Sequence, residues 1–162
     1  DLAKSYDPVY KVNPPLRTQA DVMALREGLA DGTIDIVATD HAPHPAESKE
    51  CEWQYAAFGM LGLETALPIL WQTMIESKMM DIQTLQTRMS SAPAQIGRYH
   101  SQGKALVKGA PANLTLFAPS KSWKVDRDLV ASKSKNTPFH GMEFGGSVVA
   151  TFFEGRESWR LK

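Results

Sequence analysis

The sequence predicts an α/β fold followed by a small antiparallel β unit, and three stretches of the chain carry this prediction. An apolar stripe with helical spacing runs over residues 19–30 and ends at Gly32. The β-branched run at residues 34–38 follows directly, which predicts a strand buried on both faces, as in a parallel sheet. Beyond about residue 100, short apolar runs alternate with glycines and prolines, a pattern typical of antiparallel strands.

The chain begins with an irregular stretch and a stiff loop. Residues 1–10 show no clear period, and the Pro-Pro pair in residues 11–17 disfavours helical backbone at each preceding residue. Asn13 is therefore presented on an extended loop, where its ordinary role would be an Asx turn. Because the chain opens at Asp1 in a polar stretch without a methionine, we expect it to be a piece of a longer protein.

Capping residues and apolar stripes predict several helices between residue 18 and about residue 100. Thr18 with Asp21 resembles a capping box at the start of the first predicted helix. A second apolar stripe predicts a helix over about residues 63–78, and Asp81 is placed to cap a third. Ser91, followed by alanine and proline, opens another short helix.

The composition of the chain limits which binding partners and which cellular compartment are expected. The 162 residues are 43% hydrophobic, which is enough for a real core. Lys plus Arg and Asp plus Glu both number 18, so the net charge is zero and favours neither nucleic acid nor an acidic membrane surface as a partner. No apolar stretch approaches the roughly 20 residues of a transmembrane helix. The single cysteine, Cys51, excludes an internal disulfide and fits a cytoplasmic location.

Three polar residues just beyond the predicted strand form the candidate site. Asp40, His41 and His44 lie on a proline-rich segment, at the end of a strand where α/β folds place their ligands. Together they offer a metal ligand, a proton carrier and a hydrogen-bond donor. Singly, each has an ordinary explanation as a helix cap, a turn residue or a solvated histidine. Their proximity favours a site, although spacing alone identifies neither metal nor reaction.

Two further regions bear on function. The loop over residues 46–59 is long enough to cover the strand ends, and Phe58 and Gly59 could bring backbone groups close to a ligand, unless Gly59 simply starts the next helix. In the C-terminal third, the Glu-Gly pair within residues 153–156 predicts a hairpin turn. We interpret His100 and His140, which lie in or beside this β unit, as structural.

Several motifs of the chain together resemble a known family. They are Lys-Val-Asn-Pro-Pro-Leu-Arg at 11–17, Asp-Gly-Thr-Ile-Asp at 31–35, Ala-Thr-Asp-His-Ala-Pro-His at 38–44, and the segments at 58–68 and 132–139. In this order and spacing they resemble the last barrel segments of bacterial-type dihydroorotases of the amidohydrolase superfamily. The resemblance covers almost the whole chain.

The resemblance implies both an architecture and an activity. Residues 1–101 would be the C-terminal part of a metal-dependent (β/α)8 TIM barrel, and residues 102–162 would be strands of a small β-sandwich. The activity would be the reversible, zinc-dependent hydrolysis of the cyclic amide of dihydroorotate to N-carbamoyl-aspartate, in pyrimidine biosynthesis, with one or two zinc ions.

The resemblance also implies roles for individual residues. By position, Asp40 would be both a zinc ligand and the catalytic acid/base. Asn13, His44 and the backbone of Phe58 and Gly59 would hold the small-molecule substrate. A carboxylate beside an activated water can take its proton and return it to the leaving nitrogen. We assign His41 to orienting the loop.

The length of the chain sets an expectation about its partners. A (β/α)8 barrel needs about 250 residues, and the remaining metal ligands of the family would lie upstream of Asp1. We therefore expect this chain alone to be inactive and to work with an N-terminal barrel portion, and possible further partners are a second copy or a carbamoyltransferase. Two other functions stay open: another cyclic amidohydrolase, hydantoinase-like or allantoinase-like, and a non-catalytic structural partner of a carbamoyltransferase. The Asn-Pro-Pro-Leu-Arg element argues against the first, and only the upstream ligands would distinguish the second.

Overall fold

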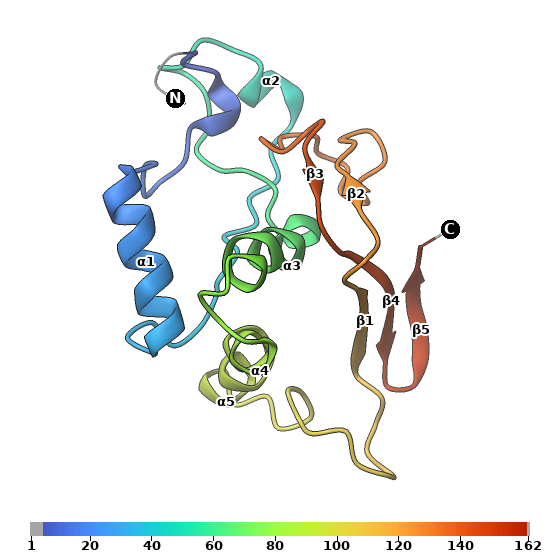
Figure 1. Cartoon of the computed structure of the whole chain (residues 1–162). Helices are drawn as coiled ribbons and strands as arrows, with labels where there is room; N and C mark the ends of the chain where they lie inside the picture. Colours follow the sequence, from blue (N-terminus) through green and yellow to red (C-terminus); the bar gives the residue numbers. More distant parts are fainter. Residues whose placement is uncertain (1–4, 162) are drawn as a thin grey trace. The chain divides into compact units, whose positions relative to one another are not determined.

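The computed structural model of the chain describes residues 5–161 and shows helices followed by strands (Figure 1). The expectation of an irregular start falls partly on residues 1–4, which lie outside the described residues. None of the helices in the described chain is long and apolar enough to cross a bilayer. The helices are α1 (Gln19–Asp31), α2 (Ala46–Lys49), α3 (Leu63–Leu70), α4 (Ile82–Gln86) and α5 (Ala92–Ile96), with a 3-10 turn at Pro8–Tyr10 and π-helical turns at Trp71–Glu76 and Thr87–Ser91. The strands are β1 (Leu114–Ala118), β2 (Trp123–Lys124), β3 (Glu143–Phe144), β4 (Ser147–Phe153) and β5 (Arg156–Arg160).

The described chain separates into two compact units, each made of three segments. The first contains residues 5–22, 38–66 and 124–143, and the second contains residues 23–37, 67–123 and 144–161. The first unit holds every residue of the candidate site. It also holds His140, which the sequence predicts to lie in or beside the C-terminal β unit. The proposed division between residues 101 and 102 stays a prediction.

The first predicted helix is confirmed, together with its capping. The Asp21 carboxylate accepts a hydrogen bond from the Thr18 backbone N–H (3.0 Å), and the Thr18 hydroxyl oxygen accepts one from the Asp21 backbone N–H (3.4 Å), as a capping box requires. The Thr18 hydroxyl also donates to the Asp21 carboxylate (2.8 Å). The two bonds to the carboxylate lower the pKa of Asp21. After α1 the chain turns at Gly32, whose φ of +98° is a conformation that glycine adopts without strain.

The predicted strand at residues 34–38 is wrong. Its N–H groups donate to helical segments: Ile34 to the Gly28 carbonyl at the end of α1 (2.8 Å) and Val37 to the carbonyl of Arg88 (3.1 Å). Ile34 and Val37 pack against the apolar core of the second unit, and the run is half-buried or exposed where burial on both faces was expected. The apolar face exists, but helices cover it, so no strand ladder forms.

Side chains from helical segments and from the bend before α4 make an apolar cluster in the second unit. Leu29, Met74, Met80 and Leu85 are buried together, with Met79 and Met89 among the partly buried side chains around them. The helix predicted to reach residue 78 is regular only to Leu70 and continues as a π-helical turn. The predicted cap of α4 is confirmed, since the Asp81 carboxylate accepts a hydrogen bond from the Thr84 N–H at 2.7 Å.

The C-terminal β unit is confirmed as antiparallel. Strand β4 lies between β1 and β5 (Figure 1), with Leu114 of β1 opposite Phe152 of β4. The predicted hairpin joins β4 to β5 through Glu154 and Gly155, whose φ angles of +50° and +79° suit a two-residue turn with both residues left-handed. Strands β2 and β3 pair separately as a two-stranded sheet.

Candidate functional site

The segment carrying Asp40, His41 and His44 is irregular, as the sequence predicts. Asp40 is exposed and has a φ of +45°, which few residues other than glycine adopt. Such a conformation costs on the order of 1–3 kcal/mol and persists only where the surrounding structure imposes it. The backbone therefore presents the Asp40 carboxylate to solvent at a point of local strain.

His41 ties this segment to the stretch that leads into α3. Its Nδ1 accepts a hydrogen bond from the Gly62 N–H (3.1 Å), which places the ring proton of a neutral His41 on Nε2. His41 and Met60 form a parallel β-bridge, and the Ala42 N–H donates to the Met60 carbonyl at 3.0 Å. These contacts agree with the role of orienting the loop.

His44, Phe58 and Gly59 are brought together. The His44 ring Nε2 lies 2.8 Å from the Phe58 carbonyl oxygen, to which it donates. Gly59 is buried with a φ of +133°. A Cβ at Gly59 would overlap the Cβ of Ala42 and lie 3.0 Å from His44 Nε2. The two segments therefore approach so closely that only glycine fits.

Asn13 lies on a neighbouring loop. Lys11, two residues before it, accepts a hydrogen bond at its carbonyl from the Gly59 N–H (2.9 Å). The Asn13 side chain is exposed, and its peptide bond to Pro14 is cis. The loop of Asn13 is thus joined to Gly59 through backbone, while the side chains of Asn13 and Asp40 face solvent.

Two buried lysines were not singled out from the sequence. Lys11 is 8% exposed, and its Nζ donates to the carbonyls of Trp53 (2.8 Å) and Gln54 (3.1 Å). The same ammonium lies 4.6 Å from the centroid of the Phe58 ring, a cation–π distance. Lys11 therefore secures the loop that ends in Phe58 and Gly59.

Lys49, in the short helix α2, secures the same loop from its other side. It is 5% exposed, and its Nζ donates to the Ala57 carbonyl (2.9 Å) and to the Lys11 carbonyl (3.3 Å). Burial lowers the pKa of Lys49, and the nearby charge of Lys11 lowers it further. Hydrogen bonds to carbonyls leave no pattern in a sequence, and the one signal for Lys11 is its place in the motif at residues 11–17.

Asn136 was also missed as a site residue. Its side chain is 7% exposed and hydrogen-bonds to three backbone groups, the N–H of His44 and the carbonyls of Ala42 and Gly59. The sequence offered only one signal, the occurrence of Asn136 inside the motif at residues 132–139.

The described chain does not gather a complete metal site. Within residues 5–161, no group of three or more His, Cys, Asp or Glu side chains is arranged to hold a metal ion. Zinc in proteins usually has three or four protein ligands. An exposed carboxylate such as Asp40 has the right chemistry for one of them, and the described residues supply no full set.

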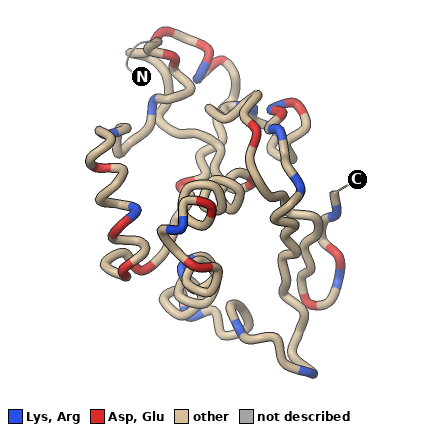
Figure 2. Tube along the Cα trace, in the orientation of Figure 1, with Lys and Arg blue, Asp and Glu red and all other residues tan. Residues whose placement is uncertain are grey.

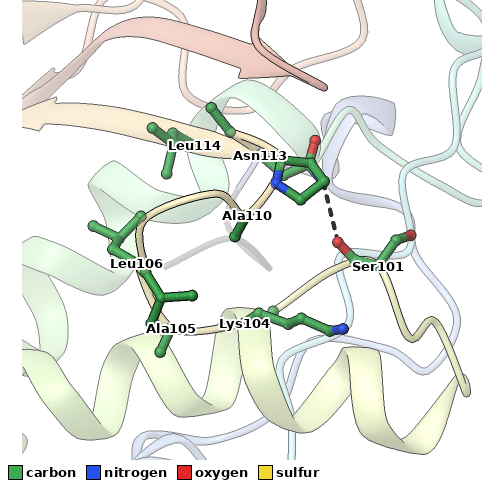
Figure 3. A pocket seen from close by; sticks show the side chains of 11 residues that line it. Ser101, Lys104, Ala105, Leu106, Ala110, Asn113 and Leu114 are labelled. Carbon is green, nitrogen blue, oxygen red and sulfur yellow. Dashed lines mark hydrogen bonds between the residues drawn. The ribbon is translucent and has the colours of Figure 1, made fainter.

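The described chain also has a cavity that is separate from the residues of the candidate site. This cavity of about 330 Å³ lies in the second unit along residues 101–114, and Figure 3 shows the Asn113 amide bonded to the Ser101 carbonyl at its edge. Lys104 is the ionisable residue of its lining, which contains neither a carboxylate nor an imidazole. None of the residues of the candidate site lines this cavity.

Comparison with known proteins identifies dihydroorotases as relatives, although no family model matches the chain. The chain is 54% identical over 156 residues to the dihydroorotase of Streptomyces coelicolor, covering 96% of this chain and 36% of that protein. The identity is 49% to the dihydroorotase of Leifsonia xyli and 47% to that of Mycobacterium tuberculosis, each over 96% of this chain. The resemblance found in the motifs is confirmed, and the chain spans about 36% of the length of these curated relatives.

Solved structures of hydantoinases also match nearly the whole of this chain and about a third of their own length. The chain superposes on the L-hydantoinase (dihydropyrimidinase) of Arthrobacter aurescens with a TM-score of 0.88 at 33% identity, covering 98% of this chain and 36% of that one. The D-hydantoinase of a Thermus species matches at 24% identity with a TM-score of 0.84, which indicates a shared fold alone. The chain therefore has the α/β fold of a portion of these hydrolases.

Proposed function

We propose that this chain supplies part of the active site of a dihydroorotase, which reversibly hydrolyses the cyclic amide of dihydroorotate to N-carbamoyl-aspartate in pyrimidine biosynthesis. Identity of 47–54% to dihydroorotases over 96% of the chain supports the substrate class. The observation that carries the proposal is the close packing of the His44 segment on Phe58 and Gly59, beside the exposed carboxylate segment of Asp40. The interspersed charges of the chain (Figure 2) and its zero net charge suit a small substrate better than a polyanion.

The proposed architecture is the C-terminal part of a (β/α)8 barrel followed by strands of a β-sandwich. In this arrangement, the irregular segment at residues 38–44 would lie at the end of the barrel where barrel enzymes hold their catalytic residues. The parallel bridge between His41 and Met60 supports the proposal, because parallel neighbours are what a barrel requires. Partner strands would come from a further barrel portion.

Asp40 would be a zinc ligand and the catalytic acid/base. The bound metal would supply Lewis acidity toward the amide carbonyl. The Asp40 carboxylate would accept a proton from the attacking water and pass it to the ring nitrogen as the amide bond breaks. The local strain at Asp40 is the kind of feature that accumulates at functional sites. The other ligands would have to come from outside the described residues.

His44, Asn13 and the backbone at Phe58 and Gly59 would hold the substrate. Because His44 Nε2 donates to the Phe58 carbonyl, a neutral His44 has an acceptor at Nδ1, and only the protonated ring donates to a substrate there. The Gly59 N–H already donates to the Lys11 carbonyl. The backbone would therefore bind the ring amides through the Phe58 and Gly59 carbonyls, each of which has a second lone pair that can accept a hydrogen bond. Asn13 offers both a donor and an acceptor from its exposed amide.

A hydantoinase-like activity is the second candidate, because the L-hydantoinase of Arthrobacter aurescens superposes with a TM-score of 0.88. The test is to purify the full-length protein, load it with zinc and offer dihydroorotate, N-carbamoyl-aspartate, hydantoin and allantoin separately. We expect interconversion of the first two, lost on chelation and restored by zinc. Turnover of hydantoin or allantoin alone would move the function to that class. Absence of turnover in a metal-loaded protein would favour a non-catalytic partner of a carbamoyltransferase.

A further inference from the structure

The side chain of Asn136 makes three hydrogen bonds to the backbone of the candidate site, using both of its N–H donors and one lone pair of its oxygen. Its Nδ2 donates to the Ala42 carbonyl (2.9 Å) and to the Gly59 carbonyl (3.3 Å). Its Oδ1 accepts from the His44 N–H at 3.2 Å. One carboxamide thereby joins the segment that carries His44 to the segment that carries Gly59.

The backbone of Asn136 reinforces this connection. Its carbonyl accepts a hydrogen bond from the Leu61 N–H (3.1 Å), two residues beyond Gly59. Asn136 is 7% exposed, so solvent cannot easily replace any of these bonds. Residues 42–44 and 59–61 are held from one buried point on a third segment of the chain.

We infer that Asn136 is a positioning residue for substrate binding, fixing the His44 ring relative to the Phe58 and Gly59 carbonyls; this inference rests on the proposed function. The contact between His44 Nε2 and the Phe58 oxygen, at 2.8 Å, joins the two segments at the surface where substrate would bind. Asn136 fixes the backbone on both sides of that contact. Its effect on catalysis passes through His44 and Gly59, because Asn136 itself is buried behind them.

Two substitutions of similar size break this connection in different ways. Asn136→Asp keeps an acceptor for the His44 N–H but sets a carboxylate oxygen against the carbonyls of Ala42 and Gly59. Asn136→Leu removes all three bonds. Thr137→Val is the matched control, because Thr137 is the next residue, is 5% exposed, and its hydroxyl accepts only from the nearby Phe139 N–H (3.3 Å).

The experiment measures steady-state kinetics with dihydroorotate in the full-length protein. We expect Asn136→Leu and Asn136→Asp each to raise KM by about tenfold, and kcat to change by no more than about threefold in either. Thr137→Val should leave KM unchanged. In a His44→Ala background, Asn136→Leu should raise KM by less than about threefold, because the group it positions has been removed. An unchanged KM in both Asn136 variants, or full multiplication of the effects in the double variant, would overturn the inference.

Hydrogen exchange of the peptide covering residues 41–45 gives a readout that does not depend on turnover. The His44 amide should keep its protection in Asn136→Asp and lose it in Asn136→Leu. Equal protection in the leucine variant and the unsubstituted protein would overturn the inference. Absence of dihydroorotate turnover in the unsubstituted protein would instead contradict the proposed function, so the two failures are distinguishable.

Discussion

Gly59→Ala tests whether the close packing of the two site segments is as tight as the structure shows. The substitution adds one methyl group at a residue with a φ of +133°, a region that other residues rarely occupy. The new Cβ would overlap that of Ala42, lie 3.0 Å from His44 Nε2 and lie 3.4 Å from the Ala42 carbonyl oxygen. Backbone strain and steric overlap therefore act together at this position.

The magnitude follows from the two contributions. A strained backbone conformation costs on the order of 1–3 kcal/mol, and overpacking costs about another 1–3 kcal/mol. We expect Gly59→Ala to lower the free energy of unfolding by about 2–6 kcal/mol. Gly141→Ala is the matched control in the same unit, because its φ is +80° and nothing lies within 4 Å of its added Cβ. It should cost only the backbone contribution, about 1–3 kcal/mol, without the overpacking.

The assay is urea denaturation of the full-length protein and both variants, followed by fluorescence and by circular dichroism. If the two probes coincide, the midpoints give the difference in free energy of unfolding directly. Gly59→Ala should unfold at a clearly lower urea concentration than Gly141→Ala. Equal losses of stability in the two variants would refute the reasoning, because they would show that no tight contact exists between Gly59 and the segment of Ala42 and His44.

The remaining predictions concern a buried charge and a substrate contact. Burial lowers the pKa of Lys49 below its ordinary 10.5. Between the lowered pKa and 10.5, the folded state therefore binds fewer protons than the unfolded state. The free energy of unfolding should rise with pH across that window. Lys49→Met should remove this rise in urea titrations at several alkaline pH values, and an identical pH dependence in the variant would contradict the assignment. His44→Ala should raise KM for dihydroorotate by about fivefold or more, with a smaller change in kcat. An unchanged KM would show that His44 does not contact the substrate.

The parts of the fold that were predictable are those with local causes. Helix α1 follows from an apolar stripe and from the capping box of Thr18 and Asp21, and the hairpin follows from the Glu-Gly turn at residues 154–155. In each, the residues that determine the structure are within a few positions of one another. The local sequence was therefore sufficient to predict these elements.

The run at residues 34–38 shows where this reasoning stops. Its β-branched residues correctly indicate a segment with an apolar face. Whether a strand or a helix covers that face depends on residues distant in sequence. Here the Val37 N–H donates its hydrogen bond to the Arg88 carbonyl, where in a sheet it would donate to a neighbouring strand. Periodicity carries no information about such partners.

The candidate site divides in the same way. The resemblance to dihydroorotases drew attention to Asp40, His44, Phe58 and Gly59, and the structure packs the last three together. Their supports, Asn136 and the two buried lysines, act through backbone carbonyls and amides that any residue possesses. Their importance becomes visible only once the chain is folded.

Asp40→Asn in the zinc-loaded, full-length protein tests the central claim most directly. Asparagine is nearly isosteric and tolerates a positive φ better than most residues, so the fold and its thermal midpoint should be unchanged. Because the carboxylate would move the proton of the reaction, turnover of dihydroorotate should fall by about 10²–10⁴-fold. Turnover within about threefold of the unsubstituted protein would show that the reaction, if it occurs, does not depend on Asp40.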